Sequence, residues 1–158
     1  MDRPQTARLT PGRIAFAGVA TVVFVLDQIT KSVVAAQIPY GTEVSVVGRL
    51  VGITNVRNSG AAFGMAPAFT SFFLVASVIV SIGLVVYVVR TPSPLWTDAI
   101  LGLILGGTVG NGFNRLVYGS VTDFVNVHFW PVFNVADSAI SIGVTTLIVG
   151  TLIRRPKA

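Results

Sequence analysis

The chain has 158 residues, of which 53% are hydrophobic and 11% charged, and its mean hydropathy is +0.79. Soluble domains carry about twice that charged fraction, so the composition excludes an ordinary soluble domain and indicates a membrane protein. The net charge of +5 does not point to nucleic acid, because the basic residues flank apolar runs and form no basic face with interleaved aromatics. The absence of cysteine excludes disulfides and thiolate metal sites, and a single histidine argues against a histidine-based metal site or triad.

Four apolar segments approach or meet the length of about 20 residues that a spanning helix requires. We expect them at 14–36, 69–89, 99–116 and 135–153. The predicted fold class is therefore a mainly α integral membrane protein with four transmembrane helices, forming one domain over residues 1–158. Basic residues cluster before the first span, after the second and after the fourth, which predicts that both termini are cytoplasmic.

Two segments on the opposite, outer side of the membrane have distinct compositions. Residues 37–68 contain "TEVSVVGRLVGITNV", rich in β-branched residues and punctuated by glycine, so we expect a small β-structure at the membrane surface. Residues 117–133 mix β-formers with Phe129, Trp130 and Phe133. Aromatic residues prefer the membrane interface, which predicts an interfacial loop there.

Polar residues near the ends of the spans need an explanation. Asp27 and Lys31 share one helix face at i,i+4 spacing, so they either form an ion pair that lowers the cost of two charges or also border a site. In "RNSGAAFGM", residues 57–65, Asn58 can hydrogen-bond a peptide backbone and small residues such as Gly60 permit close approach. The alternative for this stretch is a glycine-rich loop that re-enters the next span.

A further group of hydrogen-bonding side chains lies in one turn at the outer end of the third span. Asn111 and Arg115 are at i,i+4 spacing, and Asn114 follows Asn111 by three residues. Small residues upstream favour close helix packing, but three such side chains exceed what packing requires.

Two lone acids flank the outer loop between the third and fourth spans. Asp123 is either an exposed loop acid or half of a pair, and Asp137 with Asn134 resembles a capping box at the start of the fourth span. The loop returns to the bundle and brings its ends together. Two carboxylates in a partly apolar site share a proton: the ionised acid activates a water, and the protonated acid polarises a carbonyl and later protonates the leaving amine.

These blocks together resemble the lipoprotein signal peptidase (signal peptidase II) family. The matching pieces occur in the family's order and spacing: "DQITK", "RNSGAAFG", "GGTVGN" with Arg115, "GSVTDF" and "FNVADSAI". The resemblance implies an aspartic protease of the bacterial inner membrane, with its active site near the outer face. It would remove the signal peptide from a diacylglyceryl-modified prolipoprotein, just before the lipidated cysteine.

The resemblance also implies roles for individual residues. Asp123 and Asp137 match the catalytic dyad. The supporting residues would be Asn58, Gly60, Asn111, Asn114, Arg115, Asn134, Asp27 and Lys31. The family uses no metal or organic cofactor, and its partners are the prolipoprotein substrate, membrane lipid and globomycin-type peptide inhibitors. We expect residues 41–57 and 117–133 to clamp an extended peptide between them.

Asn114 departs from the family pattern, which usually has an acid directly before the arginine. An acid there would be expected to pair with Arg115, so the replacement raises the question of how Arg115 is held. Two other classes remain open on the residues alone. A small transporter or proton conductor would use intramembrane acids, but these acids cluster at one membrane face. A non-enzymatic assembly factor using "GLILGG" as a packing face would leave Asp123 and Asp137 unexplained.

Overall fold

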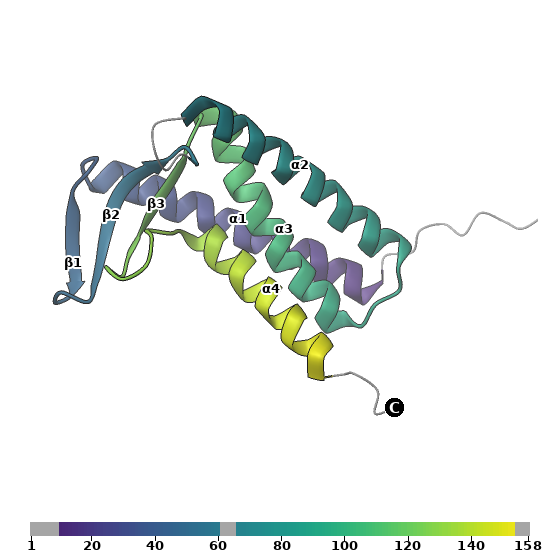
Figure 1. Ribbon diagram of the computed structural model, residues 1–158. Coiled ribbons are helices and arrows are strands. Elements are labelled where there is room, and N and C mark those ends of the chain that lie inside the picture. The colour runs from purple at the N-terminus through teal and green to yellow at the C-terminus, as the bar shows by residue number, and fades with distance from the viewer. Residues whose placement is uncertain (1–9, 61–65, 154–158) are drawn as a thin grey trace, which may run out of the picture.

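The computed structural model describes residues 10–60 and 66–153, and Figure 1 shows a helix bundle with a small sheet at one end. The elements in chain order are α1 (Pro11–Gln37), β1 (Glu43–Val47), β2 (Val51–Asn58), α2 (Ala66–Arg90), α3 (Leu95–Tyr118), β3 (Val121–Asn126) and α4 (Val135–Ile153). Both the start of α1 and the end of α4 lie at the end of the bundle opposite the sheet. The predicted mainly α membrane fold with a small β-rich part is confirmed.

Helices α1, α2 and α3 extend further than the predicted spans, whereas α4 has the predicted bounds. Thr10 accepts a hydrogen bond from the Arg13 backbone N–H at 3.3 Å, and Pro11 occupies the first turn, so α1 starts before the apolar run. Helix α3 begins at Leu95, directly after Pro94, and includes Asp98 in its first turn. The connection between α2 and α3 is therefore residues 91–94, shorter than the 90–98 that the predicted spans left between them.

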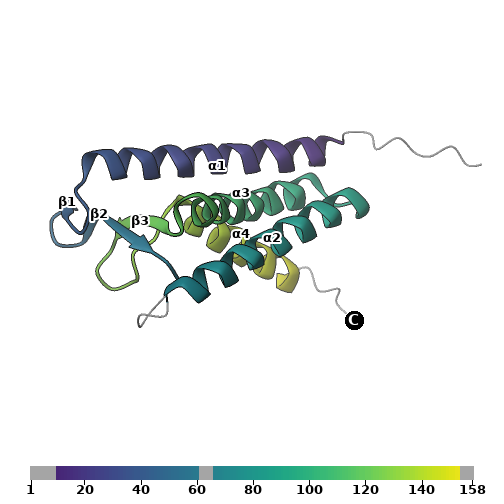
Figure 2. The ribbon, with the colours of Figure 1, turned by 90° about the horizontal axis from the view of Figure 1, so that it is seen from above.

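Helix α3 is the centre of the bundle and packs against α1, α2 and α4 (Figure 2). Glycines make this possible, because a Cβ on Gly106 would lie 2.6 Å from the Ala20 carbonyl oxygen of α1, and one on Gly107 only 2.4 Å from that of Ala136 in α4. Among the described residues, α1, α2 and α4 are long and apolar enough to cross a membrane by composition. Several polar residues of α3 are buried in this packing: Asp98, Thr108, Asn111 and Asn114.

The three strands form one antiparallel sheet in the order β1-β2-β3. Residues 117–133 therefore contain a strand, β3, where the composition predicted only an interfacial loop. The expected clamp cannot hold a peptide between β2 and β3, because these strands pair with each other, and a clamp formed with the rest of residues 117–133 stays a prediction. The aromatic part of the prediction fits the remainder of the loop, in which Phe129 is 87% exposed and Trp130 65% exposed.

The alternation of side chains along β2 and β3 gives the sheet two different faces. Asn58 pairs with Val121 and Arg57 pairs with Thr122 across the two strands. Since successive side chains point to opposite faces, Asn58 shares a face with Asp123, whereas Arg57 and Thr122 lie on the other. One face of the sheet therefore carries the predicted dyad acid, and the other carries a basic residue beside a hydroxyl.

Candidate active site

Asp123 lies in β3 and is buried, with 2% of its surface exposed. Its carboxylate accepts hydrogen bonds from the Asn58 side-chain amide at 2.9 Å and from the Asn134 side-chain amide at 2.6 Å. Burial raises the pKa of the Asp123 carboxyl from its ordinary value of 3.8 to about 6, and the negative charge of Asp137 acts in the same direction. The two amide hydrogen bonds and the Lys31 charge oppose this rise. Asp123 is thus a buried acid that holds its proton at a higher pH than usual, and not the exposed loop acid of the alternative reading.

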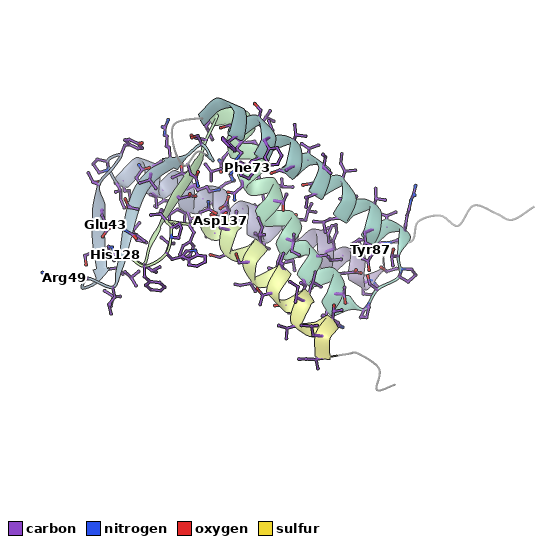
Figure 3. All side chains as sticks on the ribbon, viewed as in Figure 1. Glu43, Arg49, Phe73, Tyr87, His128 and Asp137 are labelled. Atoms are coloured by element: carbon purple, nitrogen blue, oxygen red, sulfur yellow. The ribbon has the colours of Figure 1, made fainter. Side chains whose placement is uncertain are left out.

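Asp137 lies in the first turn of α4, at the junction of the helix bundle and the sheet (Figure 3). Its backbone N–H donates to the Asn134 side-chain oxygen at 2.9 Å, and the Asn134 N–H donates to the Asp137 carboxylate at 3.2 Å. This reciprocal pair is a capping box, as the sequence predicted. The other carboxylate oxygen accepts from the Asn111 amide at 2.7 Å, which holds the half-buried side chain in place.

Asn134 connects the two acids. The side chain is fully buried, and its amide nitrogen donates to Asp123 while its oxygen caps the helix start that carries Asp137. The same amide also donates to the Asn111 oxygen at 3.2 Å. Asp123 and Asp137 are therefore brought to one site by a single shared asparagine.

Asp27 and Lys31 of α1 form a buried ion pair at 2.7 Å next to the two acids' hydrogen-bond partners. The Lys31 ammonium also donates to the side-chain oxygens of Asn111 and Asn114, both at 2.8 Å, so all three of its protons are used. The second Asp27 oxygen accepts from the Ala136 N–H at 3.0 Å. The predicted ion pair is confirmed, and it also contacts Asn111 and the start of α4.

The neighbours of Asn114 and Arg115 differ from the expectation. Asn114 hydrogen-bonds Lys31 and Gln28, so the acid that the family usually has there would face Lys31 and not Arg115. The Arg115 guanidinium instead lies over the Phe73 ring, 5.1 Å from its centroid, a cation–π arrangement. Its buried Nε has no hydrogen-bond partner among the described residues. Asn114 and Arg115 contact different helices because successive side chains of a helix point about 100° apart.

Gly60 and two residues that the sequence analysis missed complete the surroundings. Gly60 adopts a φ of +83° and its N–H donates to the Asn58 oxygen at 2.7 Å, which orients the Asn58 amide toward Asp123. Gln28 donates to Asp27 at 2.9 Å, and its position inside "DQITK" was the available signal. Phe73 gave no signal, because an aromatic residue within an apolar run is indistinguishable from a lipid-facing one.

The chain matches the family model described as signal peptidase (SPase) II over residues 19–153. It is 40% identical to a lipoprotein signal peptidase of Gloeobacter violaceus, over 84% of this chain and 79% of that protein. A lipoprotein signal peptidase of Rhodococcus jostii is 43% identical, over 89% of this chain and 74% of the relative.

Solved structures agree with these sequence matches. Two structures described as bacterial membrane enzymes superpose with TM-scores of 0.80 and 0.82, each at 30% identity. The first alignment covers 90% of this chain and 93% of the other, and the second covers 89% and 94%. With the family model spanning most of the residues, this chain belongs to the signal peptidase II family.

Proposed function

We propose that the protein is an aspartic endopeptidase that removes the signal peptide from diacylglyceryl-modified prolipoproteins, cleaving just before the lipidated cysteine. The relatives named lipoprotein signal peptidase support the substrate class. The single observation that carries the mechanism is the pair of acids held by one asparagine: Asn134 donates to Asp123 and caps the helix turn of Asp137.

The two acids have unequal surroundings, which assigns them different roles. Asp123 is buried and its pKa is raised to about 6, so it is the acid that carries the shared proton. Asp137 is half-buried in the first turn of α4, and the two acids share only one proton. Asp137 is therefore the base that activates water.

In the proposed reaction, Asp137 takes a proton from water as the hydroxide attacks the scissile carbonyl carbon. The Asp123 carboxyl donates a hydrogen bond to the carbonyl oxygen as negative charge develops on it. When the C–N bond breaks, the Asp123 proton passes to the leaving amine. The reaction then leaves a proton on Asp137, and its transfer to Asp123 restores the starting state.

The proposed location follows from the membrane and the charge distribution. A lipidated substrate is confined to the bilayer, so its protease must be there too. We place the chain as one multi-pass domain, residues 1–158, in the bacterial inner membrane with both termini cytoplasmic and the sheet at the outer face. Surrounding lipid and the substrate are its partners, and peptide inhibitors of the globomycin type would occupy the dyad.

The test is cleavage of a purified prolipoprotein by the purified protein in lipid nanodiscs, with the products mapped by mass spectrometry. We expect a single cut on the amino side of the cysteine when that cysteine carries the diacylglyceryl group. The matched control is the same precursor without the lipid, which should be cleaved far more slowly. Equal cleavage of both precursors, or a cut elsewhere, would contradict the proposed specificity.

A further inference from the structure

Behind the dyad, on the opposite face of the sheet, two cavities meet at Arg57. One, of about 210 Å³, lies between α1, α3 and the sheet, and the other, of about 300 Å³, lies beside the end of α1. Both are lined by Ala35, Arg57 and Thr122. Arg57 and Thr122 lie on the sheet face away from Asp123, and neither cavity is lined by Asp123 or Asp137.

The first cavity is rich in hydrogen-bond donors. Its polar lining includes Gln28, Ser32, Arg57, Tyr118, Ser120 and Thr122. In the part of the chain that the structure describes, no carboxylate forms an ion pair with Arg57, and the hydroxyls of this lining donate no hydrogen bond to protein. Asp27, the nearest acid of the α1 network, is completely buried and already paired with Lys31. A cavity with an unpaired guanidinium and several free hydroxyls favours an anion with several acceptor oxygens.

The position of the cavity indicates the source of that anion. The cavity is lined by Gln28 and Ser32 of α1, and the residues that follow them, Ile29 and Val33, are 53% and 46% exposed on a helix apolar enough to span a membrane. Tyr118, 65% exposed, lies at its rim on the last turn of α3. An apolar flank below and an aromatic hydroxyl at the rim are typical of the headgroup level of a bilayer.

We propose that the cavities at Arg57 bind the phosphate of an anionic phospholipid, with the phosphodiester on the Arg57 guanidinium. Arg57 lines both cavities, so the phosphate on its guanidinium lies where they meet, and the polar headgroup lies in the cavities. The acyl chains lie along the exposed flank of α1. Basic pockets beside membrane helices bind phospholipid headgroups by this chemistry.

This lipid is distinct from the proposed substrate, whose diacylglyceryl group carries no phosphate. Lipid binding therefore stands or falls independently of the cleavage reaction. The site also adjoins the polar network of the dyad, since Gln28 and Asn114 line the cavity and Asn114 accepts from Lys31. A headgroup bound in this cavity would therefore contact Asn114, which accepts a hydrogen bond from Lys31, and Lys31 in turn donates to Asn111.

The test measures lipid retained by the full-length protein in native mass spectrometry. The protein is released from detergent micelles that contain either phosphatidylglycerol or diacylglycerol with the same acyl chains. We expect retention of phosphatidylglycerol and not of diacylglycerol. Arg57→Gln should lower phosphatidylglycerol retention about fivefold, the effect of one basic residue at a membrane surface.

The matched control is Arg49→Gln, at the tip of the β1–β2 hairpin and away from the cavities (Figure 3), which should retain lipid as the unchanged protein does. Thr122→Val, which keeps the shape of the side chain and removes the hydroxyl, should lower retention less than Arg57→Gln. Equal retention by Arg57→Gln and the unchanged protein would overturn the proposal. Complete displacement of the lipid by millimolar inorganic phosphate would overturn the phospholipid assignment in favour of free phosphate.

Discussion

Asp27 and Asp123 are both buried at the same end of the molecule, but their hydrogen-bond partners differ in charge. Asp27 is completely buried and is paired with the Lys31 ammonium at 2.7 Å. Asp123 is almost as buried, but its direct hydrogen-bond donors are the neutral amides of Asn58 and Asn134, and a second acid adds negative charge nearby. The first arrangement stabilises a charge, whereas the second raises the pKa of its acid, as the proposed reaction requires.

The largest expected effect on stability comes from removing the cation that pairs with Asp27. Lys31→Met leaves the Asp27 charge buried without its cation and removes the donor that holds Asn111 and Asn114. We expect the free energy of unfolding to fall by about 3–5 kcal/mol. Reversible unfolding in detergent measures it, and Arg49→Gln, at an exposed turn, should stay within about 0.5 kcal/mol of the unchanged protein. A change below 1 kcal/mol for Lys31→Met would show that the pair is not structural.

Replacing Asp123, which has no cation bonded to it, should raise the free energy of unfolding instead of lowering it. A pKa raised from 3.8 to about 6 means that the ionised Asp123 costs the folded state about 3 kcal/mol at pH 7. Asp123→Asn removes this cost, although its new amide must fit beside two donors, so we expect a gain of about 1–3 kcal/mol in the free energy of unfolding at pH 7.

The stability gained by Asp123→Asn should depend on pH, which provides a check. The folded protein binds the Asp123 proton more tightly than the unfolded chain, so its stability rises as pH falls from about 7 toward 4. The advantage of Asp123→Asn should therefore shrink over this window. An advantage that stays constant between pH 7 and pH 5 would contradict the raised pKa.

A smaller effect is expected on the pH profile of cleavage. The proposed reaction needs a protonated Asp123, so kcat/KM should fall as pH rises through about 6. Asn58→Leu removes a hydrogen bond that lowers the pKa of Asp123, and this decline should move to higher pH. Asn126→Leu, on the same strand as Asp123 but hydrogen-bonded to Glu43, is the control and should leave the pH profile unchanged. A shift toward lower pH in Asn58→Leu would be inconsistent with this account.

The smallest effect should come from Asn114→Asp. An acid at this position keeps the acceptor for Lys31, and Gln28 can turn its amide to donate to the new carboxylate. We expect the cleavage rate to stay within about threefold, since the change corresponds to less than 1 kcal/mol. Loss of cleavage in this variant would mean that Asn114 does more than support Lys31.

The sequence allowed the helices and two of the site's contacts to be predicted, because both depend on local patterns. Apolar runs of spanning length indicated the helices, and "FNVAD" indicated the Asn134–Asp137 capping box that the hydrogen bonds confirm. The i,i+4 spacing likewise indicated the Asp27–Lys31 pair.

The contacts between distant segments could not be read in the same way. The pairing of β3 with β2 depends on partners far apart in the chain, and nothing in residues 117–133 specified them. The neighbours of Asn114 depend on the direction in which each side chain leaves α3, and this direction became informative only once α1 was placed beside it.

The most direct test of the dyad is cleavage of lipidated prolipoprotein by Asp123→Asn and Asp137→Asn, each compared with the unchanged protein at pH 6. We expect both variants to lose at least about a thousandfold in rate, as loss of an acid or base and its electrostatic role implies. The unfolding measurement on Asp123→Asn excludes misfolding as the cause, because that variant should be more stable. If either variant, folded and in the membrane, cleaves at the rate of the unchanged protein, the two acids do not form the catalytic pair.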